Sequence, residues 1–305
     1  MRVVVTGGAG FIGSHLVDSL VARGDQVTVI DDFSTGSEAN CNAAAEVSRL
    51  DIGSADAADL IRRLRPDVVS HHAAQMSVSQ SVRDPLADAR INIMGGLNIL
   101  EAAATANARF IFSSTGGAIY GDTDQLPTPE TYRPWPVSPY GVAKLSLEHY
   151  LHSYQAQDRI RFTALRYANV YGPRQNPHGE AGVVAIFCRA LVQGREVVIN
   201  GDGEQTRDYI HVADVVRANL AAVDSEESGI FNVGTGVQTD VNTIYELLRQ
   251  SLNSDAGARH GPAKPGEQRT SCLDSALIQE RLGWRATQPL EAGLAETAAW
   301  FRAAG

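Results

Sequence analysis

A glycine-rich loop near the start of the chain constrains the fold more than any other stretch. Val3 to Val5 form a short apolar run, Gly7 to Gly13 follow it, and residues 14–23 carry apolar side chains at helical spacing. The loop satisfies both Gly-x-Gly-x-x-Gly and Gly-x-x-Gly-x-x-Gly. Such glycines let the backbone turn sharply and approach a pyrophosphate, and the free N–H groups at a helix start favour an anion. A strand, a glycine loop and a helix in this order predict a dinucleotide-binding unit.

An aspartate after the next strand indicates which nucleotide binds. Residues 26–30 are typical of a second buried strand, which ends in Asp31 and Asp32. Asp31 lies 18 residues past Gly13, where a carboxylate binds the ribose hydroxyls of adenosine. Because a carboxylate repels a 2′-phosphate, NAD is expected rather than NADP.

Strands and helices keep alternating through the first half of the chain. Residues 66–71 and 108–112 are typical of buried strands, and residues 91–104 between them show a helical pattern. This alternation predicts an α/β fold with a doubly wound parallel sheet, in which ligands bind at the carboxyl ends of the strands. The small-residue turn at residues 73–75 is expected to pack on the dinucleotide.

Tyr140 and Lys144 are candidate catalytic residues. Ser138 is a good N-cap and Pro139 suits the first helical position, so a helix is expected to begin here. The Tyr140 and Lys144 side chains then lie one turn apart on one face. An adjacent ammonium and the positive end of a helix both favour a phenolate, so a lowered phenol pKa and a role as general base are expected.

Composition narrows the classes of function. The chain has 305 residues, 44% of them hydrophobic, and its net charge of −9 argues against a nucleic-acid-binding face. Cys41, Cys188 and Cys272 are few and widely spaced, as expected in a reducing cytoplasm without disulfides. His71 and His72 have no cysteine partner, so structural roles and no metal are expected. The N-terminus runs directly into a strand pattern, and no apolar run reaches the ~18 residues of a membrane span. A soluble cytoplasmic protein without membrane contact is therefore expected.

Together these features resemble the extended short-chain dehydrogenase/reductase superfamily. Four longer motifs resemble the NAD-dependent sugar-nucleotide epimerases and dehydratases, most closely the UDP-glucose 4-epimerases; they span residues 165–173, 200–214, 231–234 and 264–267. The resemblance extends from Met1 to about Trp284 and implies a Rossmann domain with bound NAD and a smaller α/β lobe for the nucleotide sugar. It places residues 1–170 in the NAD-binding domain, with a return at about 205–235, and residues 171–305 in the interleaved substrate lobe.

The resemblance also implies roles for individual residues. The catalytic set is Thr115, Tyr140 and Lys144. The NAD contacts are Gly7, Gly10, Phe11, Ile12, Gly13, Asp31, Asp32, Asp51, Ile52, Ala73, Ala74, Gln75, Asn92, Ser113, Tyr140, Lys144 and Tyr167. The substrate contacts are Ser114, Thr115, Tyr140, Asn169, Arg207, Lys264 and Glu267. Arg207, Lys264 and Arg269 are candidate cations for a diphosphate, and for each the alternative is a surface ion pair.

By resemblance, Tyr140 removes the proton from the sugar 4-hydroxyl, and the hydride at C4 passes to NAD and returns to the other face. Lys144 lowers the pKa of the phenol and holds the nicotinamide ribose. The hydroxyl that hydrogen-bonds the same sugar oxygen belongs to Ser114 or Thr115. The chain is one residue longer than the family pattern here, and counting from the strand selects Thr115. The expected reaction interconverts UDP-glucose and UDP-galactose.

Several alternatives use the same cofactor. A 4,6-dehydratase acting on a dTDP-sugar needs an Asp-Glu pair after the threonine, where this chain has Gly116 and Gly117. UDP-glucuronate epimerase and decarboxylase activities remain open, as does a non-catalytic dinucleotide-binding protein. Ser271 stands where a bulky tyrosine narrows the family's sugar pocket, so N-acetylated hexosamines are also expected to fit.

The family commonly forms dimers, so a homodimer is expected. The two helices involved would span roughly residues 92–104 and 140–154. The apolar side chains of Leu145, Leu147 and Leu151 fit either a core or a dimer seam, and the sequence leaves both readings open.

Overall fold

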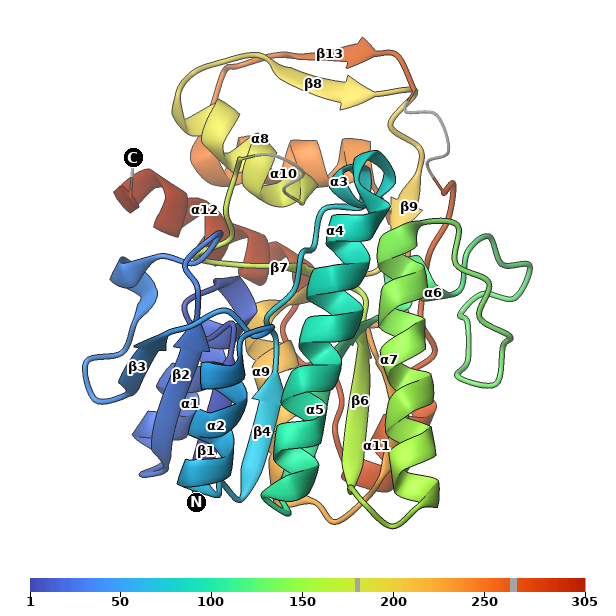
Figure 1. The fold of residues 1–305 in the computed structure, drawn as a ribbon. Helices are drawn as coiled ribbons and strands as arrows, with labels where there is room; N and C mark the ends of the chain where they lie inside the picture. Colours follow the sequence, from blue (N-terminus) through green and yellow to red (C-terminus); the bar gives the residue numbers. More distant parts are fainter. Residues whose placement is uncertain (179–181, 264–267, 305) are drawn as a thin grey trace.

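The computed structural model describes residues 1–178, 182–263 and 268–304, and within them the central element is a seven-stranded parallel sheet. Its strand order is β11-β6-β5-β4-β1-β2-β3 (Figure 1). The strands are β1 (Arg2–Thr6), β2 (Gln26–Asp31), β3 (Glu46–Arg49), β4 (Val68–His71), β5 (Arg109–Thr115), β6 (Phe162–Tyr167) and β11 (Gly229–Val233). The predicted doubly wound α/β fold is confirmed.

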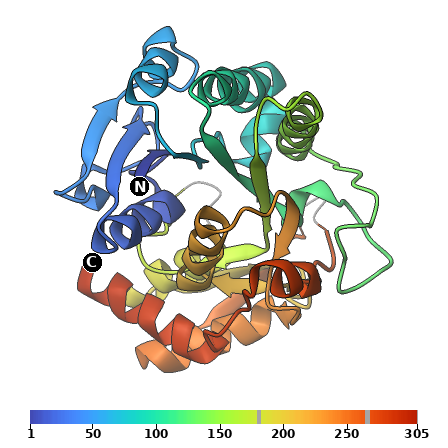
Figure 2. The same ribbon diagram turned by 90° about the horizontal axis from the view of Figure 1, so that it is seen from below.

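Helices cover both faces of this sheet, as the view from below shows (Figure 2). One face carries α2 (Ala55–Leu64), α5 (Gly96–Thr105) and α7 (Pro139–Ala156), whose apolar side chains form one buried cluster with the sheet. The other carries α1 (Phe11–Ala22), α9 (Val212–Asp224) and α11 (Ala276–Leu282), which contribute to a second cluster. Leu147 and Leu151 of α7 lie in the first cluster. Their apolar face is therefore core and not a dimer seam.

A smaller lobe lies above the carboxyl ends of the sheet strands (Figure 1). Its buried cluster is built from α8 (Val183–Val192), α10 (Val241–Leu252), α12 (Leu290–Ala304) and β8 (Val197–Asn200), which pairs with β13 (Ala258–Gly261). The apolar run at residues 183–192 predicts a helix, and α8 has these bounds. Two short strand pairs connect the lobes: β7 (Asn169–Tyr171) with β10 (Tyr209–His211), and β9 (Thr206–Arg207) with β12 (Thr239–Asp240). After β10 the chain runs through α9 into β11, which pairs with β6 in the large sheet.

The prediction of a single helix at residues 91–104 is wrong at the start of that helix. A π-helical turn, η2 (Arg90–Gly95), precedes α5. The wider turn directs the Asn92 amide toward the loop after β4, where its oxygen accepts from the Gln75 backbone N–H at 2.9 Å.

The remaining short helices are η1 (Glu38–Asn40), α3 (Val78–Arg83), α4 (Pro85–Ala89) and α6 (Gly116–Ile119). Within the described ranges, no helix combines the length and apolar character that a bilayer crossing requires.

The histidines at the end of β4 make the structural contacts expected of them. His71 is buried; its Nδ1 lies 2.7 Å from Thr6 Oγ1 and its ring stacks on Phe112 with 6.0 Å between centroids. His72 Nε2 lies 2.9 Å from Ser70 Oγ. Burial lowers the pKa of His71 well below its usual value and that of His72 to about 3, and the Lys144 charge adds to both effects. Both imidazoles are therefore neutral in the folded protein at pH 7.

The buried His71 makes acid stability testable. Below a pH of about 6.5 the unfolded imidazole binds a proton that the folded one does not, so the free energy of unfolding falls as pH falls. We expect His71→Asn to be less stable at pH 7.5 and to lose less stability between pH 6.5 and 5, by on the order of 2 kcal/mol. Urea unfolding measures both values. His149→Asn, on the exposed side of α7, should keep the native pH dependence; an equally steep loss in His71→Asn would contradict the prediction.

Candidate active site

The first turn of α7 presents Tyr140 and Lys144 at the carboxyl edge of the sheet. Ser138 caps the helix by accepting from the Gly141 N–H at 3.2 Å, and Pro139 occupies the first helical position, as expected from the sequence. The Tyr140 N–H donates to Ser81 Oγ of α3 at 3.1 Å. The start of α7 is thus held both by its own cap and by a neighbouring helix.

Lys144 is a buried cation that ties α7 to β5. Its Nζ donates to the Ser113 carbonyl at 2.9 Å and lies 4.9 Å from the centroid of the Phe112 ring. Burial lowers the pKa of Lys144 to about 8, and the carboxylates of Asp88 and Glu148 limit the fall. At pH 7 the side chain is therefore still largely an ammonium.

Tyr140 lies within reach of this charge but is not activated by it. The Lys144 Nζ is 5.9 Å from the centroid of the Tyr140 ring. Burial raises the pKa of the Tyr140 phenol, and the negative charge of Asp88 adds to the rise. The prediction that the protein's own groups lower this pKa is therefore wrong, because desolvation outweighs the ammonium and the helix end.

The end of β5 separates the two candidate hydroxyl groups. Ser114 is only 3% exposed, and its Oγ donates to Glu148 Oε1 at 2.6 Å inside the protein. Thr115 is half-buried at the boundary of β5 and α6 and pairs in register with Tyr167 of β6. Since successive side chains of a strand point to opposite faces, the two hydroxyls cannot serve the same site. The prediction that Ser114 contacts the substrate is wrong for this reason, and Thr115 remains the candidate.

Gly116, the first of the two glycines after Thr115, is closely packed. A Cβ added to Gly116 would lie 2.4 Å from Leu273 Cδ1. A Cβ added to Gly117 would lie 3.6 Å from Asn169 Oδ1, so the exposed Asn169 of β7 is a neighbour of this turn. The structure thus brings Asn169 close to Thr115.

The glycine loop forms a tight cradle at the carboxyl end of β1. Gly7 has a φ of +70°, and a Cβ there would lie 2.6 Å from the Ala73 nitrogen. A Cβ on Gly13 would lie 2.2 Å from the Gly7 carbonyl oxygen. Gly10 caps α1 without a side-chain hydrogen bond, and Phe11 and Ile12 begin the helix. The close backbone approach and the helix start fit a pyrophosphate.

Asp31 supports this cradle directly. Its two carboxylate oxygens accept from the backbone N–H groups of Ala9 and Phe33, each at 2.9 Å, and the residue is buried. A carboxylate offers about four acceptor positions, so these two bonds leave capacity for ribose hydroxyls. Asp32 is exposed and accepts from the N–H and hydroxyl of Ser34. Of the two aspartates, Asp31 therefore faces the glycine loop.

Asp51 and Ile52, two of the predicted NAD contacts, follow the carboxyl end of β3. Ile52 is buried, and its carbonyl accepts from Asn98 Nδ2 at 2.7 Å. Asp51 is exposed and accepts from the Gly53 N–H at 2.8 Å. Both residues remain candidates for the cofactor.

The loop at Ala73, Ala74 and Gln75 is held by the buried carboxylate of Asp88, which is not among the predicted site residues. Asp88 Oδ1 accepts from Gln75 Nε2 and Asn92 Nδ2, each at 2.9 Å, and only 2% of Asp88 is exposed. Burial raises the pKa of Asp88, although both hydrogen bonds oppose the rise. The spacing of Asp88 and Asn92, one helical turn apart, was the available signal.

The remaining predicted residues differ in what surrounds them. Tyr167 is buried, and its hydroxyl hydrogen-bonds with the Asn219 amide of α9. Arg207 is half-buried, and its Nη1 donates to the Thr206 carbonyl at 2.8 Å. Arg269 is a surface ion pair, with Asp202 at 2.7 Å and Glu204 at 3.0 Å, so the diphosphate role considered for it is not supported. Lys264 and Glu267 lie outside the described residues.

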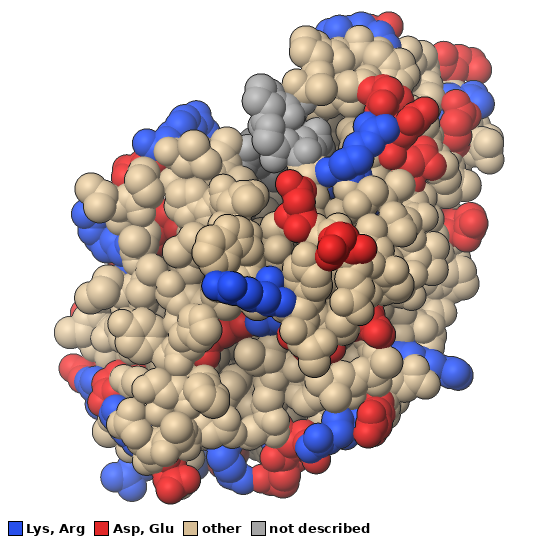
Figure 3. Space-filling model, turned by 90° about the vertical axis from the view of Figure 1, so that its right-hand side faces the viewer, with Lys and Arg blue, Asp and Glu red and all other residues tan. Residues whose placement is uncertain are grey.

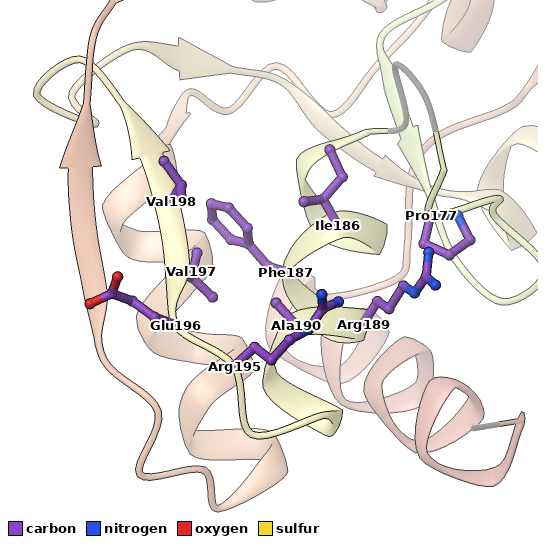
Figure 4. A pocket seen from close by; sticks show the side chains of 9 residues that line it. All are labelled: Pro177, Ile186, Phe187, Arg189, Ala190, Arg195, Glu196, Val197 and Val198. Atoms are coloured by element: carbon purple, nitrogen blue, oxygen red, sulfur yellow. The ribbon is translucent and has the colours of Figure 1, made fainter.

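The smaller lobe contains a hollow of about 250 Å³ between α8 and β8 that no predicted residue lines (Figure 4). Apolar side chains from both elements line it, together with Arg189, Arg195 and Glu196. The lining residues are Pro177, Ile186, Phe187, Arg189, Ala190, Arg195, Glu196, Val197 and Val198. On the side of the molecule shown in Figure 3, the coloured acidic and basic groups are interspersed and leave no broad positive area among the described residues.

Comparison with known proteins identifies the family. Residues 3–234 match the model of the NAD dependent epimerase/dehydratase family. UDP-glucose 4-epimerase of Mycolicibacterium smegmatis is 42% identical over 99% of both chains. The crystal structure of UDP-glucose 4-epimerase from Thermotoga maritima with UDP-glucose is 47% identical and covers 100% of this chain and 99% of its own, with a TM-score of 0.96. That of the Thermus thermophilus enzyme in complex with NAD is 40% identical and covers 100% of both chains, with a TM-score of 0.95. The chain belongs to the NAD dependent epimerase/dehydratase family.

Proposed function

We propose that this protein is an NAD-dependent UDP-glucose 4-epimerase that interconverts UDP-glucose and UDP-galactose. The observation that carries the proposal is the common edge shared by the glycine cradle, Thr115 and the Tyr140–Lys144 pair. The relatives with which the chain aligns over nearly its whole length carry this activity, and their structures hold UDP-glucose or NAD. The same fold, cofactor cradle and base therefore support the same reaction here.

The cofactor site fits NAD on two grounds. Gly7 and Gly13 sit where any Cβ would collide with backbone, so glycines permit the tight loop that brings the start of α1 to a pyrophosphate. The buried Asp31 places a negative charge where a 2′-phosphate of NADP would lie. When bound, NAD supplies a hydride acceptor for the sugar C4 and the positive charge of its oxidised ring.

We assign the proton transfer to Tyr140. Its phenolate accepts the proton of the sugar 4-hydroxyl, while Thr115 hydrogen-bonds the same oxygen. Lys144 holds the end of β5 through the Ser113 carbonyl, and its ammonium opposes, without outweighing, the desolvation that keeps the phenol protonated. Tyr140 returns the proton to the same sugar oxygen as the other epimer forms, which regenerates the phenolate.

Binding of the nucleotide sugar falls to the smaller lobe. We propose that Arg207 binds the diphosphate and that Asn169, beside Gly117, contacts the substrate next to Thr115. Lys264 and Glu267 belong to the same proposal through their place in the family motif. An anchor on the diphosphate leaves the hexose able to turn over between the two hydride transfers.

The neighbourhood of Thr115 disfavours a dehydratase. Elimination of water from the sugar requires an acid and a base just after the threonine. Gly116 is packed so closely on Leu273 that no side chain fits there, and Gly117 offers none. These two positions therefore supply no carboxylate for elimination, whereas Thr115, Tyr140 and Lys144 provide the groups for transient oxidation.

Replacement of the base tests the reaction. We expect the purified protein to interconvert UDP-glucose and UDP-galactose without added NAD, and Tyr140→Phe to lower kcat by roughly 10²–10⁴-fold because proton transfer is lost. Product chromatography measures turnover, and absorbance after denaturation measures retained NAD. Tyr150→Phe, on the exposed side of the same helix, is the matched control. Full activity of Tyr140→Phe, or turnover only of other UDP- or dTDP-sugars, would refute the assignment.

The position of Ser271 bears on substrate range. This residue is buried beside β9, where its N–H donates to the Thr206 carbonyl at 3.2 Å. We expect activity on UDP-N-acetylglucosamine because a serine leaves room for the acetamido group, and we expect Ser271→Tyr to abolish that activity while keeping turnover of UDP-glucose. Parallel assays on both sugars decide this. Absence of UDP-N-acetylglucosamine turnover in the unaltered protein would exclude the wider range.

We further propose a cytoplasmic homodimer. The described thiols Cys41, Cys188 and Cys272 are free, as a reducing compartment allows. An apolar hollow of about 460 Å³ opens between α4, η2 and the start of α7. Large exposed apolar side chains occur on α3, α4, η2 and α7 and in the segment just before α7, a clustering that is typical of an interface. They are Val82, Leu86, Met94, Val137 and Val142.

A charge placed on this surface should separate the subunits. We expect the protein to elute as a dimer and Val142→Glu to elute as a folded monomer, because a carboxylate at an apolar interface loses its hydration. Light scattering after size exclusion gives the mass. Val198→Glu, at a similarly exposed valine of β8, should remain dimeric. A monomeric native protein would rule out the dimer.

A further inference from the structure

A buried ion pair lies directly beneath the proposed catalytic residues. Glu148 of α7 and Arg166 of β6 have side chains that are 1% and 4% exposed. Arg166 Nε donates to Glu148 Oε1 at 3.0 Å, and Nη2 donates to Oε2 at 2.6 Å. The contact is bidentate, the strongest geometry that these two groups can form.

Further hydrogen bonds connect this pair to two other strands. The Ser114 hydroxyl at the end of β5 donates to Glu148 Oε1 at 2.6 Å. Arg166 Nη1 donates to the Tyr120 hydroxyl, which in turn donates to Asn232 Oδ1 of β11, both at 2.8 Å. The pair therefore joins α7 to three neighbouring strands of the sheet.

The position of Glu148 on α7 links it to the chemistry. Tyr140, Lys144 and Glu148 follow one another at intervals of four residues, so they lie on one face at successive turns. Lys144 binds the Ser113 carbonyl, and Glu148 binds the hydroxyl of the next residue. These two contacts hold the strand immediately before Thr115, and a shift of α7 along the sheet would break both.

The ion pair also affects the balance of charges around Lys144. The charged groups facing Lys144 are Asp88 from α4 and Glu148 from α7. His71 of β4 and His72, which follows it, face Lys144 as neutral rings, since burial lowers the pKa of each. Arg166 compensates Glu148 within hydrogen-bond distance, so loss of either partner would leave a new unpaired charge about two helical turns from Tyr140.

Stability alone does not account for such a pair. A buried ion pair loses so much hydration that well-packed apolar side chains often serve equally well or better. What apolar packing cannot provide is a directional contact that specifies one register of helix and strand. The hydrogen bonds of Ser114 and Arg166 to the same carboxylate provide that direction.

We propose that Ser114, Glu148 and Arg166 are positioning residues for the reaction. They hold α7 against β5 so that Tyr140 meets the substrate oxygen bound by Thr115. Arg166 also neutralises the Glu148 carboxylate. The inference rests on the proposed function. It assigns a role to Ser114 that differs from substrate binding, and to two side chains that touch neither substrate nor cofactor.

Charge-changing variants distinguish this role from a purely structural one. In Glu148→Gln the unpaired Arg166 cation should favour the Tyr140 phenolate and move the acid limb of the kcat profile down by roughly one pH unit. The double variant Glu148→Gln/Arg166→Met removes both charges and should return the limb to its native position while kcat stays low.

Ser114→Ala should lower kcat by roughly tenfold, with an unchanged limb and an unchanged KM, because only the geometry is altered. Glu101→Gln, which breaks the exposed pair with Arg159, is the matched control and should behave as the native enzyme.

The outcomes separate the two proposals. Native kcat in Ser114→Ala, or an unmoved limb in a folded Glu148→Gln, overturns the inference. If Glu148→Gln does not fold, Ser114→Ala and the double variant still decide the matter through kcat and the position of the limb. If the native protein has no epimerase activity, the proposed function fails. The inference is then tested by titrating Tyr140 by phenolate absorbance in the NAD-loaded protein, as the difference between each variant and its Tyr140→Phe derivative, with the same shifts expected.

Discussion

The hydrogen bond from the Lys144 ammonium to the Ser113 carbonyl is the contact on which the site depends. It fastens the first turns of α7 to the carboxyl end of β5 and thereby brings Tyr140 and Thr115 to one edge of the sheet. An ammonium in this place has lost most of its water, and burial brings its pKa down to about 8. The cation persists at neutral pH because Asp88 and Glu148 face it and the Phe112 ring lies beneath it.

The same desolvation favours the neutral forms of the histidines and the tyrosine nearby, so it lowers the pKa of the bases and raises that of the acid. It keeps His71 and His72 neutral and raises the pKa of the Tyr140 phenol. A neutral, protonated tyrosine is the resting condition that the protein's own groups impose. In an epimerase that condition is useful, since the phenol is then activated only when a positively charged cofactor and a sugar hydroxyl are brought to it together.

The interleaving of the chain explains how two lobes can meet so closely over this edge. After β6 of the large sheet the chain passes through β7 into the smaller lobe, returns at β10 beside β7, and then runs through α9 to β11, which completes the large sheet. Asp208, between β9 and β10, accepts hydrogen bonds from the Thr235, Gly236 and Leu273 N–H groups, which come from segments far apart in the sequence. Arg207 and the Leu273 contact with Gly116 are thus positioned by one buried carboxylate.

The sequence by itself determined the features that arise from neighbours along the chain: the glycine cradle, Asp31 at the end of a strand, the Ser138–Pro139 start of α7 and the bounds of α8. Capping, periodicity and glycine spacing are local, so they can be read without a fold. Only the tertiary structure decided that Ser114 points into the protein and Thr115 does not, that Asn92 sits on a π-helical turn, that Arg269 is bound by Asp202, and that the Tyr140 pKa rises. Each of these features depends on burial or on a contact between segments that are distant in the sequence. Local sequence patterns contain no information about either.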